Sequence, residues 1–114
     1  MTIKLNDFLE KVNAEILTPD IDISGIEINN GYVSDMLSDV MGTAKEGQVW
    51  ITIMRHMNTV AVASMTSIPC VLFAKGLKPD AAVIERACQE EVCLAVSDLQ
   101  VFELAGILYR MLNL

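Results

Sequence analysis

The side chains of this chain that could do chemistry concentrate between Gly31 and Ser64, a stretch that contains the only histidine, His56. His56 directly follows an apolar segment, and an imidazole in a loop can donate or accept a hydrogen bond and titrate near neutral pH. As a catalytic base it would need a carboxylate to orient it, which Asp35 or Asp39 could supply. The alternative is that His56 caps a loop or orients a ligand without catalysis.

The same stretch contains two Ser-Asp pairs, Ser34-Asp35 and Ser38-Asp39, at a spacing of four residues. That spacing places like residues on one face of a helix. Two carboxylates on one face can bind a divalent cation through their oxygens. More often such residues cap a turn or face water, and we predict no metal site.

Four catalytic motifs are absent from the sequence: the P-loop GxxxxGK[ST], the dinucleotide motif GxGxxG, the nucleophile elbow GxSxG and the zinc motif HExxH. Each supplies residues that its reaction needs at a fixed spacing. Kinase, dinucleotide oxidoreductase, hydrolase and zinc-protease activities therefore lose their main support. We predict that the chain is not an enzyme and has no cofactor.

The net charge excludes a further class of partner. Fifteen acidic and eight basic residues give a formal charge of −7, which repels the phosphates of nucleic acids. We expect no binding to DNA or RNA.

The chain is more apolar than a small domain requires, with 53% hydrophobic residues but only 5% aromatic ones. No run reaches the roughly 18 consecutive apolar residues of a membrane span. The N-terminal segment TIKLNDFLEK lacks the basic start and apolar middle of a signal peptide. We expect a cytoplasmic protein whose surplus apolar residues form an interface and not a membrane anchor.

Cys70, Cys88 and Cys93 show no CxxC spacing, and each lies within an apolar strand or helix pattern. Buried, reduced cysteines behave as small apolar residues. A zinc site would need His56 as its fourth ligand. We predict three reduced core cysteines.

Hydrophobic periodicity predicts an order of elements along the chain. Helices are expected at residues 4–14, 34–41, 58–67, 79–91 and 98–112, and strands at 16–17, 21–29 with a break at Gly25, 49–54, 70–74 and 92–96. We expect Asn30-Gly31 to form a turn, because both residues tolerate positive φ. The expected caps are Ser34 and Asn58 at the second and third helices, with Gly42 closing the second, and a Ser97–Gln100 capping box at the last.

Strands and helices alternate from Val49 onward, which is typical of an α/β fold with parallel strands. Right-handed crossovers would place helices on both faces of the sheet. We therefore expect residues 1–114 to form one three-layer α/β/α domain with a small mixed, partly parallel sheet. The loops 55–58, 74–79 and 97–98 should open at the carboxyl edge, where such sheets bind ligands.

The expected C-terminal helix is apolar over most of its circumference. Its polar residues form one narrow stripe: Gln100, Glu103, Arg110 and Asn113. One face of a sheet cannot bury so wide an apolar surface. A second subunit or another protein would cover the rest, and we predict a homodimer.

Three segments carry a resemblance to a known family: GYVSDMLSDVMGTAKEGQVWITIMRHMNTVAVASM, GLKPD and LAVSDLQVFELAGILYRML. Together they resemble the DRTGG domain family over nearly the whole chain, although the motif that names the family is not literal around residues 75–80. DRTGG domains are similar to the N-terminal domain of bacterial HPr kinase/phosphatase and, more remotely, to the N-terminal domain of Mur ligases. The resemblance implies a fold like that of the HPr kinase N-terminal domain.

The resemblance also implies a site. In Mur ligases the equivalent arrangement forms a pocket for a uridine nucleotide, which would place Ser34, Asp35, Thr52, His56 and Asn58 around a ligand. The expected loops and the 34–41 helix add Asp39, Ser97 and Asp98 to these candidates.

Family members occur as modules beside CBS domains and in phosphotransacetylases, which implies regulation. We therefore predict a non-catalytic regulatory module that binds a small anionic metabolite or nucleotide at the carboxyl edge of the sheet. The alternative is an interaction subunit that docks onto a larger enzyme through the C-terminal helix and needs no ligand.

Overall fold

The computed structural model describes all residues from 1 to 114. Its strands are β1 (Ile3–Lys4), β2 (Glu15–Ile16), β3 (Glu27–Ile28), β4 (Asn30–Val33), β5 (Gln48–Thr52), β6 (Cys70–Phe73) and β7 (Cys93–Val96). Its helices are α1 (Leu5–Lys11), α2 (Leu37–Thr43), α3 (Met57–Met65), α4 (Ala81–Gln89) and α5 (Val101–Met111).

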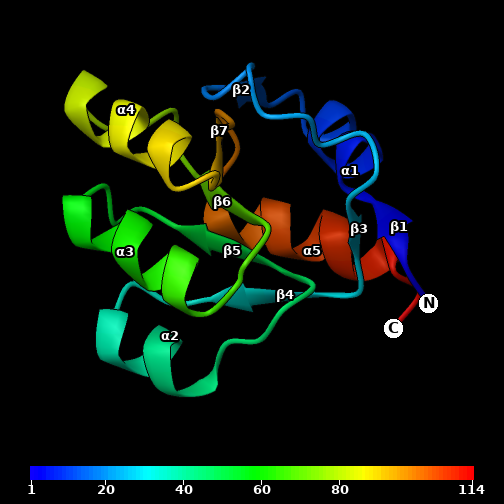
Figure 1. The fold of residues 1–114 in the computed structure, drawn as a ribbon. Coiled ribbons are helices and arrows are strands. Elements are labelled where there is room, and N and C mark those ends of the chain that lie inside the picture. The colour runs from blue at the N-terminus through cyan, green and yellow to red at the C-terminus, as the bar shows by residue number, and fades with distance from the viewer.

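Five of the strands form the main sheet, in the order β2-β7-β6-β5-β4 (Figure 1). Strands β4 to β7 are parallel, whereas β2 pairs antiparallel with β7. Strands β1 and β3 form a separate two-stranded antiparallel pair. The prediction of a mixed, partly parallel sheet is therefore confirmed.

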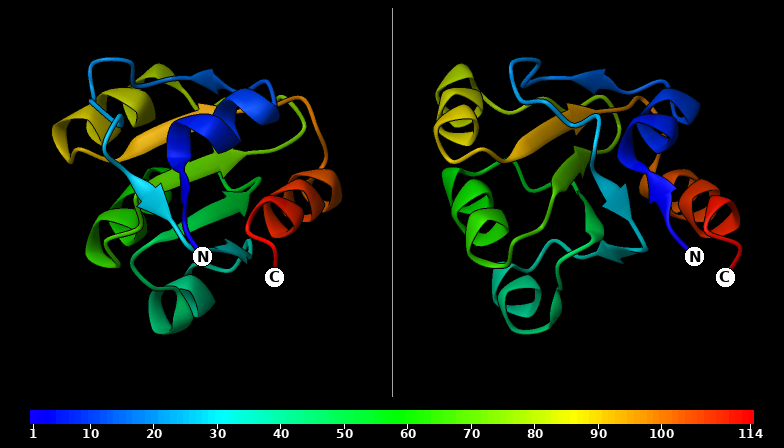
Figure 2. Two further views of the ribbon diagram at one scale, coloured as in Figure 1. Left: turned by 90° about the vertical axis from the view of Figure 1, so that its right-hand side faces the viewer. Right: turned by 45° about the vertical axis from the view of Figure 1, so that its right-hand side comes forward.

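Helices cover both faces of the main sheet, as the right-hand view in Figure 2 shows: α2, α3 and α4 lie on one side, and α1 and α5 on the other. Side chains alternate between the two faces along a strand. In β5, Val49 and Ile51 accordingly join the core under α1 and α5, while Trp50 joins the core under the other three helices. The three-layer α/β/α architecture is confirmed.

The prediction of a turn at Asn30-Gly31 is wrong, because both residues belong to β4, the edge strand beside β5. Neither has a positive φ. Gly31 is instead needed for space, because a Cβ there would lie 2.6 Å from Cδ2 of Leu108 on α5. The glycine allows α5 to pack directly onto the edge strand.

Two expected helix starts are also wrong. Helix α2 begins at Leu37, three residues late, because Ser34 Oγ accepts the N–H of Met36 (3.1 Å) and closes a turn before the helix. Gly42 lies inside α2 and does not end it. Helix α3 has His56, not Asn58, at its N-cap position.

The start of α5 differs in the same way. Gln100 occupies the N-cap position, and its N–H donates to Glu103 Oε1 (3.2 Å). The predicted Ser97–Gln100 capping box is therefore wrong, because the Ser97 hydroxyl is bonded elsewhere. Only Glu27–Ile28 of the expected 21–29 strand is extended and paired, since the Asp22 carboxylate accepts the N–H and hydroxyl of Ser24 and closes a turn.

The three cysteines are free, but only two lie in the core. Cys70 and Cys93 are register partners on β6 and β7, and both are buried. The hydrogen bond between the two thiols and their burial raise the pKa of Cys70 well above its ordinary value. Cys88 is exposed on α4, so the prediction of a third core cysteine is wrong. None of the helices has the length and apolar character needed to cross a bilayer.

Candidate functional site

Parallel strands bring their carboxyl ends to one edge of a sheet, where α/β folds bind ligands. The segments that leave this edge follow β4, β5, β6 and β7 and are Ser34–Met36, Ile53–His56, Ala74–Asp80 and Ser97–Gln100. The prediction that the strand-to-helix loops share the carboxyl edge is confirmed.

An open hollow of about 390 Å³ lies at this edge. It is bounded by the β5–α3 loop and the β6–α4 loop and is lined by Ile53, Met54, Arg55, His56, Lys78, Pro79 and Asp80. This volume lies within the range of about 300–1,000 Å³ that is usual for small-molecule sites. Of the eight predicted site residues, only His56 lines the hollow.

Two helices begin beside this hollow, α3 after His56 and α4 after Asp80. The first N–H groups of a helix have no partner within the helix, and they favour an anion. Neither His56 nor Asp80 caps its helix with a side-chain hydrogen bond. The N–H groups of Thr59 and Val83 donate to the carbonyls of His56 and Asp80, which leaves the N–H groups before them in each helix for a ligand.

Two cationic side chains also line the hollow, and they differ in their surroundings. Arg55 is exposed and takes part in no ion pair. Lys78 lies 2.9 Å from Glu15 Oε1 of β2. Arg55 is therefore the less compensated positive charge at this edge.

Asp35 is hydrogen-bonded to the last residue of β5 and to the first residue of the β5–α3 loop. Its Oδ1 accepts the hydroxyl of Thr52 (2.7 Å) and the N–H of Ile53 (3.0 Å). Thr52 is fully buried, and its Oγ1 also accepts the N–H of Met54 (3.0 Å). The structure thus connects two predicted site residues, Asp35 and Thr52, to the loop that carries His56.

Asp39 is directed to a different partner, because its Oδ2 accepts the hydroxyl of Tyr32 (2.8 Å). This hydrogen bond raises the pKa of Tyr32. Neither Asp35 nor Asp39 receives a hydrogen bond from His56. No three histidine, cysteine or acidic side chains cluster closely enough to hold a metal ion.

The remaining predicted residues are spread along the edge. Ser97 is buried, and its hydroxyl donates to the carbonyl of Val12 (2.8 Å) and accepts the N–H of Leu99. Asp98 is exposed and lies against Gly76, where an added Cβ would be 2.8 Å from Asp98 Oδ1. Asn58 lines a neighbouring depression between α3 and α4, and Ser34 closes the turn before α2.

Arg55 and Lys78 were not selected from the sequence, although both occur in loops that were expected at this edge. The signal for them is positional, because each follows a buried parallel strand. Pro79 and Asp80 line the hollow for the same reason. Their residue types alone do not distinguish them from other surface residues.

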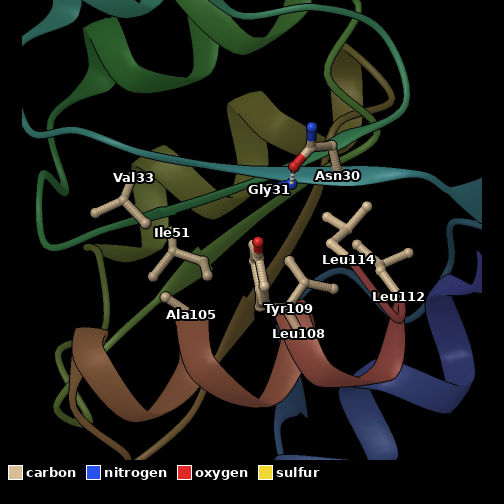
Figure 3. Close-up of a pocket in the computed structure, with 9 residues that line it drawn as sticks. All are labelled: Asn30, Gly31, Val33, Ile51, Ala105, Leu108, Tyr109, Leu112 and Leu114. Atoms are coloured by element: carbon tan, nitrogen blue, oxygen red, sulfur yellow. Dashed lines mark hydrogen bonds between the residues drawn. The ribbon is translucent and has the colours of Figure 1, made fainter.

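A second surface lies between the edge strand β4 and α5. A small apolar groove of about 100 Å³ lies there, and Figure 3 shows the residues that line it. Its lining is Asn30, Gly31, Val33, Ile51, Ala105, Leu108, Tyr109, Leu112 and Leu114. One apolar side of α5 packs into the core that it shares with α1. On its other side, Phe102 is 87% exposed and Tyr109 is 61% exposed.

The fold and this edge define a small α/β domain with an open hollow at the carboxyl edge of its sheet. No protein-family model matches the sequence, and no curated protein matches it either. A solved structure, the CBS and DRTGG domains of the regulatory region of Clostridium perfringens pyrophosphatase complexed with the activator diadenosine tetraphosphate, is similar to it, with a TM-score of 0.70 and 14% sequence identity. The similarity covers 91% of this chain and 45% of that chain, so this chain spans less than half the length of that structure. The fold is therefore DRTGG-like.

Proposed function

We propose that this domain is a non-catalytic regulatory module that binds a small anionic ligand, a nucleotide or a phosphorylated metabolite, in the hollow at the carboxyl edge. The observation that supports this most is the convergence of Arg55, Lys78 and two uncapped helix N-termini on one hollow. Backbone N–H groups and cationic side chains together favour phosphate. The similar solved structure is a regulatory region complexed with a nucleotide activator.

A binding role fits the local chemistry better than a catalytic one. His56 has no carboxylate partner to orient it as a base, and the sequence contains no P-loop. The net charge of −7 opposes long-range attraction of anions. Recognition in this proposal therefore depends on contacts within the hollow. As a separate part of the proposal, we place the module in the cytoplasm.

A thermal-shift screen against nucleotides, sugar nucleotides and phosphorylated metabolites tests the proposal. A ligand at a hundredfold excess over its dissociation constant stabilises the native state by about 2.7 kcal/mol. We expect at least one phosphorylated compound to raise the melting temperature, and His56→Ala to reduce that response. His56 supplies both an imidazole and the N-cap position of α3.

The control for this screen is Asn6→Ala, which changes an exposed polar residue of α1 outside the carboxyl edge. It should respond to the same compounds as the unmodified chain does. A stabilising compound whose effect His56→Ala leaves intact would contradict the location of the site. If no compound of the panel raises the melting temperature, the sensing function itself is contradicted.

A second candidate function is supported by exposed apolar residues of α5 and of the segment that follows it. Phe102, Tyr109 and Leu114 are all more than half exposed, and the groove beside them is mostly apolar. Such a surface suits a protein partner. The second proposal is an interaction subunit that docks onto a larger enzyme through α5 without a ligand. The homodimer predicted for the sensing module would use the same surface.

We expect Tyr109→Glu to weaken self-association by about tenfold or more, because the substitution puts a charge beside the apolar groove. Sedimentation across a concentration series measures the dissociation constant of the dimer. Arg110→Ala, on the polar stripe of the same helix, is the matched control and should leave the constant nearly unchanged. A chain that stays monomeric at millimolar concentration would exclude the homodimer, and binding to a larger enzyme would then be the form left to test.

A further inference from the structure

The β5–α3 loop contributes four of the seven residues that line the hollow, Ile53 to His56. It has no regular secondary structure of its own. What holds it in place therefore decides whether the hollow exists in a fixed shape. The restraints come from side chains outside the hollow.

The main restraint is the carboxylate of Asp35. The register of β4 with β5 ends at the pair Val33 and Ile51, after which β4 turns away toward α2. The N–H of Ile53 would then lack a partner from the β4 backbone, and Asp35 Oδ1 accepts it at 3.0 Å. One side chain thus continues the bonding of the sheet beyond the end of its edge strand.

Thr52 extends this restraint one residue further. Its hydroxyl donates to Asp35 (2.7 Å) and accepts the N–H of Met54 (3.0 Å). Thr59 of α3 then donates to the carbonyl of Met54 (2.9 Å). Three side chains in series therefore fix Ile53 and Met54, and Thr52 and Thr59 are completely buried.

The turn that contains Asp35 is also anchored to the core, through the neighbouring residue Ser34. The indole N–H of Trp50, the only tryptophan, donates to the carbonyl of Ser34 (2.8 Å). Trp50 is fully buried. The Ser34-Asp35 turn, which leads into α2, and the loop that lines the hollow are therefore joined through β5.

We propose that Asp35, acting through Thr52, is a positioning residue that holds the β5–α3 loop in its ligand-receiving shape and couples the hollow to the turn before α2. This proposal rests on the proposed function for its ligand but not for its geometry. Thr52 has no exposed surface, so it can influence a ligand only through the loop.

The first test needs no ligand. We expect Asp35→Ala to speed amide hydrogen exchange at Ile53, and Thr52→Val to speed it at Met54, by about tenfold to a hundredfold, because each variant removes the acceptor of that N–H group. Thr52→Ser keeps the hydroxyl and should restore slow exchange. Glu10→Ala, which removes an equal charge from the exposed face of α1, is the control.

The second test uses inorganic pyrophosphate as the probe, with the indole N–H signal of Trp50 as the reporter of the turn. Removing the negative charge of Asp35 would by itself strengthen anion binding, whereas loss of positioning weakens it. We expect Asp35→Ala and Thr52→Val to weaken pyrophosphate binding by about tenfold, and pyrophosphate to shift the Trp50 signal in the unmodified chain only.

Unchanged exchange at Ile53 in Asp35→Ala would overturn the proposal, and so would tighter pyrophosphate binding in that variant. Equal defects in Thr52→Ser, which keeps the hydroxyl, and in Thr52→Val, which loses it, would also overturn it, since loss of the hydroxyl would then not explain the defect. If pyrophosphate does not bind the unmodified chain but exchange responds as expected, the sensing function fails for this probe and the positioning role stands. Asp35 is exposed, so Asp35→Ala carries the test even if Thr52→Val does not fold.

Discussion

Replacing Trp50 by alanine is expected to lower the free energy of unfolding by about 3–5 kcal/mol, the usual cost of truncating a large buried aromatic residue. Trp50 is completely buried in the core beneath α2, α3 and α4. A domain of this size has a total stability of roughly 5–15 kcal/mol. The substitution therefore removes a large share of the total, and urea denaturation followed by circular dichroism measures it.

Trp50→Phe is the matched variant, because it retains most of the apolar volume but loses the N–H that donates to Ser34. We expect it to cost about 1–3 kcal/mol, since the partly buried carbonyl of Ser34 loses its donor and some core volume is lost. The difference between the two variants separates packing from hydrogen bonding. A loss below about 1 kcal/mol in Trp50→Ala would contradict the position of Trp50 in the core.

The central strands could be predicted because they are buried on both faces. Every residue of β6 and β7 is buried, which produces the continuous apolar runs typical of parallel strands. β4 shows no such run, since its four residues are exposed or only half-buried. It lies at the edge of the sheet, and its pairing with β5 comes from tertiary packing that includes Leu108 against Gly31.

The helix starts could not be located from capping residues. Met36, His56 and Gln100 occupy N-cap positions, and none of them is a preferred capping residue. The serines that suggested caps are bonded elsewhere: Ser34 closes a turn and Ser97 binds the carbonyl of Val12. Local propensity was overridden by contacts between segments far apart in the sequence.

For the candidate site, the location could be predicted from the sequence but the roles of individual residues could not. Its place at the carboxyl edge follows from the order of strands and helices, which the sequence predicts. The roles of Asp35 and Thr52 depend on how the β4–α2 turn lies beside the end of β5, which no spacing reveals. Residue type indicated polar chemistry near the edge, and the fold decides which side chains line the hollow and which support it.

Arg55→Ala is expected to weaken pyrophosphate binding by about 10- to 100-fold, the effect of losing one hydrogen bond to a charged group. Arg55 lines the hollow, which also includes the acidic residue Asp80, and takes part in no ion pair. Titration calorimetry measures the change. Arg110→Ala, which removes an equal charge from α5 outside the carboxyl-edge hollow, should leave the affinity nearly unaltered.

Lys78 provides an internal comparison for Arg55, because its ammonium group is paired with Glu15 at 2.9 Å. Exposed ion pairs are weak, about 0–1 kcal/mol, so Glu15→Gln should free Lys78 and strengthen pyrophosphate binding by about two- to fivefold. Lys78→Ala should weaken binding less than Arg55→Ala does. If Lys78→Ala lowers the affinity and Arg55→Ala does not, the anion lies on the β6–α4 side of the hollow. If neither substitution lowers the affinity, the hollow is not the anion site.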